Sequence, residues 1–343
     1  MTSPRPASPP APLPAAPRAA GSAVAAVAIG RNEGERLRAC LASLGPGVRA
    51  VYVDSGSTDG SPEAARAMGA EVVALDLSTP FTAARARNAG LARLRGSGPR
   101  PELVQLVDGD CTLAPGWIAT ARAFLEATPQ AAVACGRRRE RAPEASVYNR
   151  LCDREWDTPV GRAKACGGDA MMRMDALDAV GGFREDLIAG EEPELCVRLR
   201  AAGWEIWRLD AEMTLHDAAI ARFGQWWRRA RRAGHAFAEG AAIHGAPPER
   251  HWVAETRRAL LWGAGLPAAA LGGAALVSPW ALALLGLYPA QVARLAAREG
   301  VGSRAAWEAA FFTTLGKIAE AEGALGAIAD RLRGRRRGLI EYK

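Results

Sequence analysis

Residues 103–110 read LVQLVDGD, an apolar run that ends in two carboxylates. The run Leu103–Val107 predicts a buried strand, because short apolar runs bounded by turn residues are typical of strands. Asp108 and Asp110 can reach a common point beyond the strand end, and Gly109 leaves room for a ligand. Carboxylate oxygens of this kind suit Mg²⁺ or Mn²⁺. A tight turn is the alternative interpretation of the same residues.

Similar apolar runs alternate with helix-length segments on the N-terminal side of this stretch. The expected strands are Val24–Ile29, Ala50–Val53, Glu71–Leu75 and Leu103–Val107, and the expected helices are Glu33–Ser43, Ser61–Met68 and Ala83–Leu94. This alternation predicts an α/β fold, a mainly parallel sheet with helices on both faces. Ligands of such sheets bind beyond the carboxyl ends of the strands.

Polar residues follow the first two expected strands as well. Residues 31–33 are Arg-Asn-Glu, and residues 54–59 are Asp-Ser-Gly-Ser-Thr-Asp. Turns and helix caps explain part of this pattern. Three successive strands that end in acidic or amide groups exceed what capping needs, so we expect a binding site at this edge.

The chain from 133 to 216 is less regular. Residues 137–165 are charged and have no assignable period. The other expected elements are a strand at Val133–Gly136, a turn at Gly181–Phe183, a helix at Glu192–Ala202, and short strands at Glu205–Leu209 and Glu212–His216.

Charge is distributed unevenly along the 343 residues. The net charge is +7, but residues 219–343 carry +9 and residues 1–218 carry −2. A membrane surface or a nucleic acid can satisfy such a basic region. No nucleic-acid-binding motif accompanies the charge. The apolar content of 49% excludes general disorder.

The six cysteines form no CxxC pair or zinc-like cluster with histidine. Residues 1–22 are rich in Pro and Ala, lack the apolar core of a secretory signal, and are expected to be disordered. Both features favour reduced thiols in a cytoplasmic setting over a disulfide framework.

The segment from Ala259 to Ala293 contains no charged side chain. Its length predicts a membrane-embedded segment, and Ser278-Pro279 near its middle predicts a break. Basic residues flank both ends (Arg257, Arg258, Arg294 and Arg298), which favours a hairpin that enters and leaves on the cytoplasmic side. A buried pair of Ala/Gly-rich helices is the alternative.

Two basic segments support membrane contact. One segment fits an interfacial helix or a site for the phosphate of an acceptor substrate, and it contains Trp226, Trp227, Arg229 and Arg232. Packing of this segment against the sheet domain is the alternative. The C-terminal cluster (Arg331, Arg333, Arg335, Arg336 and Arg337) is of the kind attracted to anionic lipid.

Taken together, these motifs resemble the successive blocks of family 2 glycosyltransferases with the GT-A fold, which is Rossmann-like. The matching blocks are Val27–Leu44, Val51–Leu75, Phe81–Leu91, Val104–Asp110 and Gly167–His216. The resemblance implies a nucleotide-sugar donor and a single displacement that inverts the anomeric carbon.

The resemblance also implies roles for individual residues. Glu33 and Asp54 correspond to positions that contact the ribose and base of the donor. Arg87 and Asn88 correspond to a pair beside the donor pocket, and Asp169 to a contact with the donor sugar or acceptor.

Asp108 and Asp110 correspond to the family's DxD motif, with Asp108 also at the donor and Asp110 the preferred metal ligand. His216 corresponds to a further metal ligand. Glu192 corresponds to the catalytic base, with Glu191 as the fallback, although the family has aspartate where Glu192 stands. The implied cofactor is Mg²⁺ or Mn²⁺.

The resulting hypothesis divides the chain into five parts: a tail (1–22), a GT-A catalytic domain (23–218), an interfacial helical segment (219–256), a hydrophobic hairpin (257–298), and an amphipathic helix with an Arg-rich tail (299–343). We expect a glycosyltransferase at the cytoplasmic face of the inner membrane, with a lipid-linked or envelope-glycan acceptor and no nucleic-acid partner. A nucleotidyltransferase-like enzyme and an inactive membrane-bound scaffold are the alternatives.

Overall fold

The computed structural model describes residues 23–334 and residue 340. The predictions for the tail 1–22 and for Arg335, Arg336 and Arg337 lie outside these described residues.

The described residues form one sheet of nine strands with the order β3-β2-β1-β4-β8-β6-β9-β5, and β7 pairs with β9. The strands are β1 (Val24–Gly30), β2 (Arg49–Asp54), β3 (Glu71–Ala74), β4 (Leu103–Asp108), β5 (Cys111–Leu113), β6 (Ala131–Glu140), β7 (Gly161–Arg162), β8 (Ala170–Arg173) and β9 (Glu205–His216). Strands β1 to β4 are parallel, as predicted, whereas β5, β7 and β8 run antiparallel to their neighbours.

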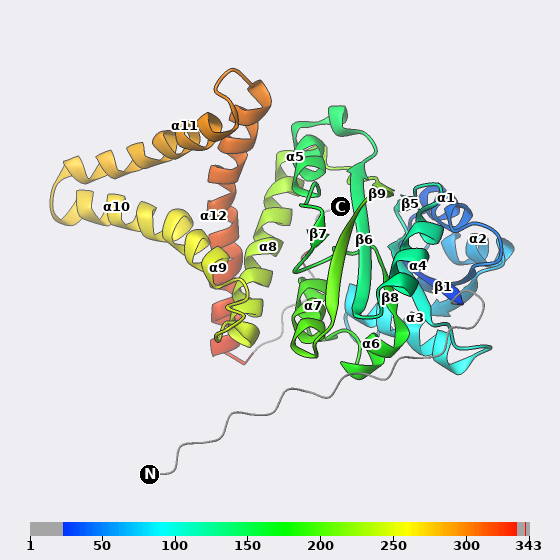
Figure 1. Ribbon diagram of the computed structural model, residues 1–343. Coiled ribbons are helices and arrows are strands. Elements are labelled where there is room, and N and C mark those ends of the chain that lie inside the picture. The colour runs from blue at the N-terminus through cyan, green and yellow to red at the C-terminus, as the bar shows by residue number, and fades with distance from the viewer. Residues whose placement is uncertain (1–22, 335–339, 341–343) are drawn as a thin grey trace, which may run out of the picture.

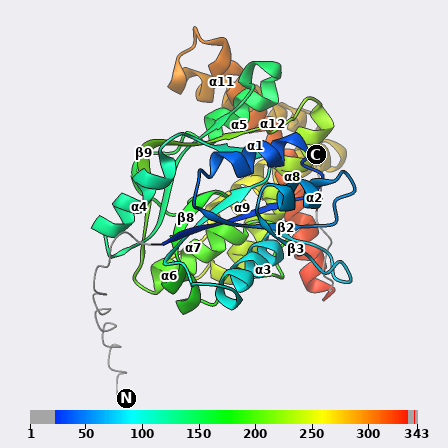
Figure 2. The ribbon, with the colours of Figure 1, turned by 90° about the vertical axis from the view of Figure 1, so that its right-hand side faces the viewer.

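Helices cover both faces of the sheet, and α1 and α3 lie on opposite sides of β1 and β2 (Figure 2). The helices of this domain are α1 (Glu35–Ser43), α2 (Ser61–Ala67), α3 (Ala83–Gly96), α4 (Trp117–Ala127), α5 (Val147–Glu155), α6 (Met174–Ala179) and α7 (Glu191–Ala201), with a 3₁₀ turn η1 (Pro143–Ala145). The predicted α/β class and the helices before residue 100 are confirmed, with boundaries shifted by one or two residues.

The register of the parallel strands brings their carboxyl ends to one edge. Gly30 pairs with Asp54 across β1 and β2, and Ile29 pairs with Asp108 across β1 and β4. Gly109 then donates its backbone N–H to the Ile29 carbonyl at 2.8 Å. A Cβ at Gly109 would lie 3.1 Å from that carbonyl oxygen. Glycine therefore lets β4 and β1 approach closely where the acidic motif begins.

The structure corrects two of the secondary-structure assignments made from the sequence between residues 133 and 216. The two short strands expected at Glu205–Leu209 and Glu212–His216 are one continuous strand, β9, because a bulge opposite Cys135–Arg137 of β6 absorbs the extra residues. The unassigned stretch 137–165 contains the end of β6, the helix α5 and the short strand β7.

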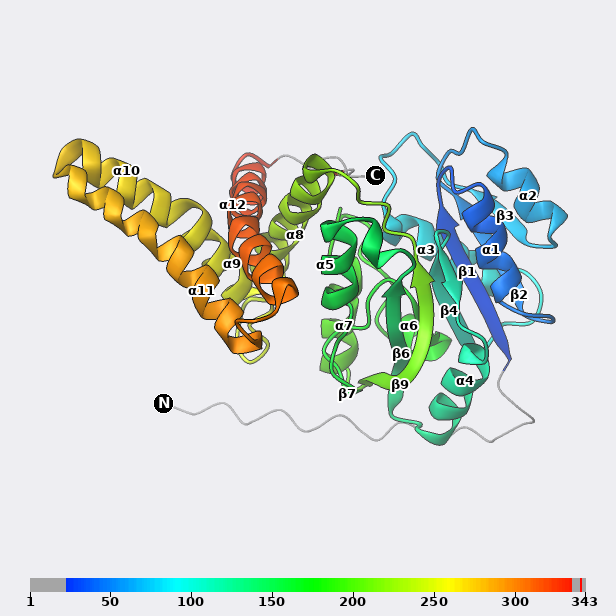
Figure 3. The ribbon, with the colours of Figure 1, turned by 90° about the horizontal axis from the view of Figure 1, so that it is seen from above.

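The C-terminal region is helical and stands beside the sheet domain. Its elements are α8 (Phe223–His244), α9 (Val253–Leu260), a π-helical turn η2 (Leu261–Gly265), α10 (Leu266–Leu276), a 3₁₀ segment η3 (Pro279–Gly286), α11 (Leu287–Glu299) and α12 (Arg304–Leu332). Helices α8 and α12 stand between the sheet and the hairpin that contains α10 and α11 (Figures 1 and 3).

Glycines allow α8 and α12 to cross in close contact. A Cβ at Gly234 would collide with the carbonyl of Glu320, and a Cβ at Gly323 would collide with the carbonyl of Arg231. Neither obstacle is a flexible side-chain end, so a larger residue forces the two backbones apart.

We therefore expect Gly323→Ala to lower the free energy of unfolding by about 1–3 kcal/mol. Gly272→Ala on α10 is the matched control, because a Cβ there meets no atom within 4 Å and alanine favours a helix. Thermal unfolding of both variants in the same detergent tests this. Equal midpoints for the two variants would contradict the close crossing.

The hairpin projects from the rest of the chain, and little of it is covered. Within residues 23–334, two helical segments are long and apolar enough to cross a membrane, Val253–Leu276 and Pro279–Glu299. Only 11% and 6% of their most apolar stretches are buried. The chain breaks at Ser278-Pro279, as predicted. Among the described residues nothing covers the tip, so within this part of the chain the two helices are not a buried pair.

An ion-pair network at the outer edge of the sheet makes the free energy of unfolding depend on pH. Glu71 of β3 accepts hydrogen bonds from Arg49 (2.7 Å), Arg93 (2.6 Å) and Ser97 (3.2 Å). The hydrogen bond from Arg49, with those from Arg93 and Ser97, lowers the pKa of Glu71 to about 2. A lowered folded-state pKa stabilises the protein above the unfolded value near 4.3, and this stabilisation is lost as the pH falls towards about 2.

We expect Glu71→Gln to cost up to about 1 kcal/mol at pH 6, the range for exposed ion pairs. The difference from wild type should shrink steadily between about pH 4.5 and pH 2. Urea unfolding over this range measures it. A difference that does not change with pH would show that Glu71 acts through packing instead of charge.

Candidate active site

Arg87 connects two carboxylates from distant parts of the chain. Its guanidinium donates to Asp108 Oδ1 at 2.8 Å and to Glu191 Oε1 at 2.7 Å, and the side chain is only 3% exposed. Helix α3 supplies Arg87, the end of β4 supplies Asp108, and the start of α7 supplies Glu191. Three of the predicted site residues therefore lie in one network.

Arg138 extends this network and was not among the predicted residues. It donates to Asp108 Oδ2 at 3.1 Å and to Asp169 Oδ2 at 2.8 Å. The alternation of side chains along β6 could have identified Arg138, because successive side chains on a strand point to opposite faces of the sheet. Arg137 pairs with Asp153 and Arg139 with Glu212, whereas Arg138 points into the site.

Charge in this network keeps Asp108 ionised. Burial raises the pKa of Asp108, but the positive charges of Arg87 and Arg138 outweigh burial, so the pKa lies below its ordinary value. Asp169 is fully buried; its Oδ1 accepts from the Asp108 N–H at 2.9 Å and its Oδ2 from Thr214 at 3.0 Å. Its contacts fix the end of β4 and the position of Arg138.

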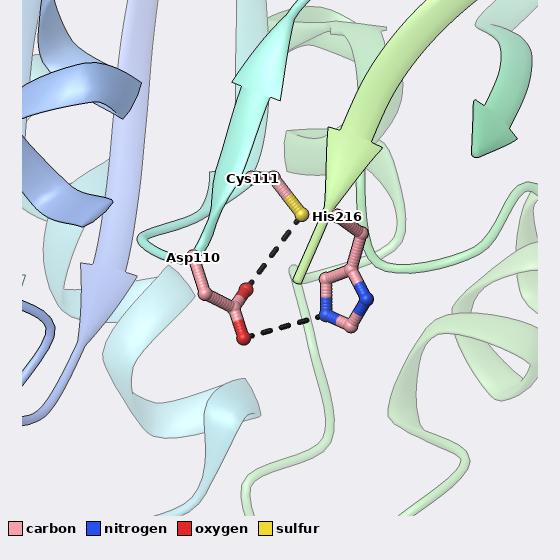
Figure 4. Close-up of side chains that lie close together, drawn as sticks. All are labelled: Asp110, Cys111 and His216. Carbon is pink, nitrogen blue, oxygen red and sulfur yellow. Dashed lines mark hydrogen bonds and ion pairs between the residues drawn. The ribbon is translucent and has the colours of Figure 1, made fainter. Parts of the chain in front are cut away.

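Asp110 and His216 form a second, adjacent pair (Figure 4). Asp110 Oδ2 lies 3.3 Å from His216 Nε2, and Asp110 Oδ1 lies 3.7 Å from the sulfur of Cys111. His216 comes from the end of β9, which pairs with β5 so that Cys111 and His216 are opposite each other. The Cys111 sulfur lies within 4.8 Å of ligand atoms in both this group and the Asp108–Asp169 pair.

Trp156 closes this side of the site. Its ring lies edge to face with His216, with centroids 4.8 Å apart, and the Arg138 guanidinium carbon lies 5.3 Å from its centroid. Trp156 follows α5 in the stretch that sequence analysis left unassigned. No local pattern pointed to it, because its role depends on how α5 packs against β6.

The donor set at Asp110 and His216 fits a divalent cation. A carboxylate and an imidazole face each other, and His216 Nδ1 is buried without a hydrogen-bond partner among the described residues. Burial raises the pKa of the Cys111 thiol well above its usual value, so this sulfur is protonated and a poor ligand for a hard cation. Both oxygens of Asp108 are engaged by arginines, so Asp110 and His216 fit a cation better than Asp108.

The two glutamates at the start of α7 point to different surroundings. Glu191 binds Arg87, whereas Glu192 Oε1 accepts from the Cys166 N–H at 2.7 Å and lies 3.0 Å and 2.9 Å from the sulfurs of Cys166 and Cys196. Burial raises the pKa of Glu192 above its ordinary value. Both residues contribute to the same cavity wall.

That cavity lies between the sheet edge and the helical region and has a volume of about 870 Å³. On the sheet side it is bounded by the Arg87–Asp108–Arg138 network and the two glutamates. The wall on the other side comes from α5, α8, α12 and the segment before α9, and includes Leu151, Arg154, Trp226, Arg229, Arg232, Phe237, Trp252 and Phe312. Asp110 and His216 are buried beside this cavity and are not part of its lining.

The position of Trp226 supports the interpretation that α8, which contains Trp226 and Trp227, packs against the sheet domain. It is 7% exposed and packs with Cys152, Tyr148 and Phe312, so it joins α8 to α5 and α12. Arg229 pairs with Glu155 through two hydrogen bonds of 2.8 Å.

The remaining predicted donor residues have mostly internal contacts. Asp54 accepts from the Tyr52 hydroxyl at 3.1 Å and from the N–H groups of Gly56 and Ser57, each at 3.0 Å. These contacts are those of a turn, although Asp54 lies at the same sheet edge as Asp108.

Glu33 pairs with Arg36 at 2.8 Å and lies beside Gly109. Asn88 exchanges two hydrogen bonds with the backbone of Phe183 and donates to Glu185. It lines a different cavity from Arg87. The donor-binding roles of Glu33, Asp54 and Asn88 stay predictions.

The sheet topology and the acidic edge define the GT-A class of α/β fold. The model of the family "Glycosyl transferase family 2" matches residues 27–180, so this part of the chain is a domain of that family. It is 29% identical over 201 residues to the succinoglycan biosynthesis protein ExoA of Rhizobium meliloti, an alignment that covers 52% of this chain and 58% of that protein. The chain thus matches little more than half the length of this curated relative.

The fold is shared with a solved mannosyltransferase, PcManGT of Pyrobaculum calidifontis, in complex with GDP-Man and Mn²⁺. The two structures have a TM-score of 0.62 and 22% sequence identity, over 89% of this chain and 88% of the other. This likeness extends the common fold beyond the sheet domain to most of the chain.

Proposed function

We propose that this protein is an inverting, metal-dependent glycosyltransferase. It transfers a sugar from a nucleotide-sugar donor to a lipid-linked or envelope-glycan acceptor at the cytoplasmic face of the inner membrane. The observation that carries the proposal is the cavity of about 870 Å³, where Arg87, Asp108, Arg138 and both glutamates face a wall formed by α8 and α12. The family match over residues 27–180 and the likeness to a succinoglycan biosynthesis protein of Rhizobium support sugar transfer in glycan synthesis.

The residues on the sheet side of the cavity have different roles in the proposed reaction. Arg87 and Arg138 present guanidinium groups beside Asp108, where they can pair with the oxygens of a diphosphate. Asp110 and His216 would hold the divalent cation, with Asp108 next to them. A cation bound there supplies Lewis-acid stabilisation of the negative charge on the leaving diphosphate.

The α7 glutamates face the acceptor side of the cavity. Glu192, the preferred base, removes the proton of the acceptor hydroxyl as that oxygen attacks the anomeric carbon. General-base help of this kind contributes about 10²–10⁴-fold to a rate. A single displacement inverts the anomeric configuration and needs no covalent enzyme intermediate.

The helical side of the cavity favours an amphipathic acceptor. Aromatic and small apolar side chains lie beside Arg154, Arg229 and Arg232, a combination that suits an apolar chain next to an anionic group. The same helices pack against the base of the apolar hairpin. We propose that 23–218 is catalytic, 219–256 interfacial, 257–298 membrane-embedded and 299–343 the supporting helix and basic end.

Donor turnover tests the proposed activity. Purified protein in lipid nanodiscs with Mn²⁺ should release a nucleoside diphosphate from at least one nucleotide sugar in a panel of different bases and sugars. Removal of the metal with a chelator should abolish the release. Mass spectrometry that finds pyrophosphate instead would support nucleotidyl transfer. No release from any donor, with intact fold, would support the inactive scaffold and contradict the proposal.

Flotation with liposomes tests the membrane part separately. Leu276, Val277 and Trp280 at the hairpin tip are 87%, 87% and 86% exposed. Placing charges in hydrocarbon is costly, so a variant with Leu276→Glu and Trp280→Glu should lose flotation. Met68→Glu, at an exposed apolar position of the sheet domain, is the control. Equal flotation of both variants would contradict embedding of the hairpin.

A further inference from the structure

Two cysteine thiols and the carboxylate of Glu192 meet beside the cavity. Cys166 lies in the loop before β8, and Cys196 lies one turn after Glu192 on α7. The two sulfurs are 3.9 Å apart, and each lies about 3 Å from Glu192 Oε1, at 3.0 and 2.9 Å. The cluster is distinct from the Asp110–His216 pair, with which it shares no residue.

We propose that Cys166, Cys196 and Glu192 form a binding site for one thiophilic divalent cation of the Zn²⁺ type. Two thiolates and one carboxylate are a ligand set that selects such cations over Mg²⁺ or Mn²⁺. Tetrahedral zinc with Zn–S bonds near 2.3 Å has an S···S edge of roughly 3.8 Å, and the observed separation is 3.9 Å. The carboxylate needs to move outward by about half an ångström to reach a tetrahedral S···O edge.

The surroundings supply what such a site needs besides its ligands. The Cys166 N–H donates to Glu192 Oε1 at 2.7 Å, which orients the carboxylate as an outer hydrogen bond does in metal sites. Glu192 is part of the cavity wall, so a cation and a fourth, water ligand have access from the cavity. On binding, each thiol loses its proton to solvent as the Zn–S bond forms, so two protons are released for each cation.

Occupancy of this site has a consequence for catalysis that rests on the proposed function. A cation on Glu192 uses the carboxylate that accepts the acceptor's proton. Thiophilic cations at low concentration should therefore inhibit sugar transfer, whereas Mn²⁺ at the Asp110–His216 pair supports it.

Cadmium binding tests the site without any enzymatic assay. Cd²⁺ is added to the full-length protein in a phosphine reductant, and the ultraviolet thiolate-to-cadmium charge-transfer band is titrated. We expect one cation per chain with the absorbance of two thiolates. The paired variant Cys166→Ser with Cys196→Ser should lose the band, and single variants should halve it and weaken binding at least tenfold.

Two other cysteine variants are matched controls. Cys152→Ser changes a buried thiol on α5 that packs in a different group of side chains, with Ile220 and Trp226. Cys111→Ser removes the thiol beside Asp110 and His216. Both should keep the band. Loss of the band in Cys111→Ser with retention in the paired variant would place the cation at the other site and overturn the proposal, as would the absence of any band in the wild type.

Inhibition of sugar transfer by Zn²⁺ is measured afterwards, with the nucleotide-sugar donor that the turnover experiment identifies. Zn²⁺ should inhibit the wild type and Cys152→Ser by at least tenfold and should not inhibit Cys166→Ser paired with Cys196→Ser. Circular dichroism of the paired variant checks that it is folded. A band without inhibition overturns the link to Glu192 and leaves the binding site in place, whereas an enzyme with no turnover bears only on the proposed function.

Discussion

Asp110→Asn is expected to reduce sugar transfer by about a thousandfold or more while the protein remains folded. The substitution keeps the size of the side chain and removes the negative charge that faces His216 at 3.3 Å. An amide is a much weaker ligand for Mg²⁺ or Mn²⁺ than a carboxylate. Loss of about 4 kcal/mol of charge stabilisation in the transition state corresponds to a thousandfold in rate.

Two measurements separate this effect from damage to the structure. Electron paramagnetic resonance of free Mn²⁺ should show weaker binding by the variant, and the thermal unfolding midpoint should change little. Asp175→Asn is the control, because Asp175 is an exposed carboxylate on α6 that pairs with Arg100 at 2.7 Å, away from Asp110 and His216 in the sequence and in the ion-pair network. Turnover within twofold of wild type in Asp110→Asn would remove the metal-ligand role of Asp110.

The position of this acidic motif is the part of the site that sequence reasoning predicted best. An apolar run fixes the strand, and parallel pairing then forces Asp54 and Asp108 to the same edge without knowledge of any distant contact. Periodicity and turn chemistry are local, so they were sufficient here.

Residues that depend on distant folding were missed. Arg138 reaches Asp108 and Asp169 only because β8 inserts between β4 and β6, and Trp156 reaches His216 only because α5 packs against β6. The crossing of α8 and α12 was equally invisible, since Gly234 and Gly323 are ordinary helix positions until the partner helix is known. Each case depended on how distant strands or helices pack together, which local sequence pattern does not specify.

The consecutive pair Glu191 and Glu192 illustrates the same limit at the centre of the mechanism. Sequence reasoning selected both and ranked Glu192 first, but residues at i and i+1 of a helix point about 100° apart. In the structure Glu191 forms an ion pair with Arg87, whereas Glu192 contacts the sulfurs of Cys166 and Cys196. The two carboxylates therefore have different partners, and their substitution should produce different kinetic changes.

We expect Glu192→Gln to lower kcat by about 10²–10⁴-fold with little change in the KM for the donor. Burial raises the pKa of the Glu192 carboxyl, and a base with a raised pKa accepts a proton more readily. Glutamine keeps an oxygen for the Cys166 N–H, so the loop before β8 should stay in place. Glu192→Asp should recover part of the activity, because it restores a carboxylate at the family's usual length.

Glu191→Gln should give the opposite pattern. Loss of the charge that holds Arg87 at 2.7 Å frees the guanidinium, so the KM for the donor should change by more than kcat. Steady-state kinetics with the acceptor at saturation distinguishes the two variants. A kcat collapse in Glu191→Gln together with near-normal turnover in Glu192→Gln would transfer the role of base to Glu191, since that carboxylate also lines the cavity.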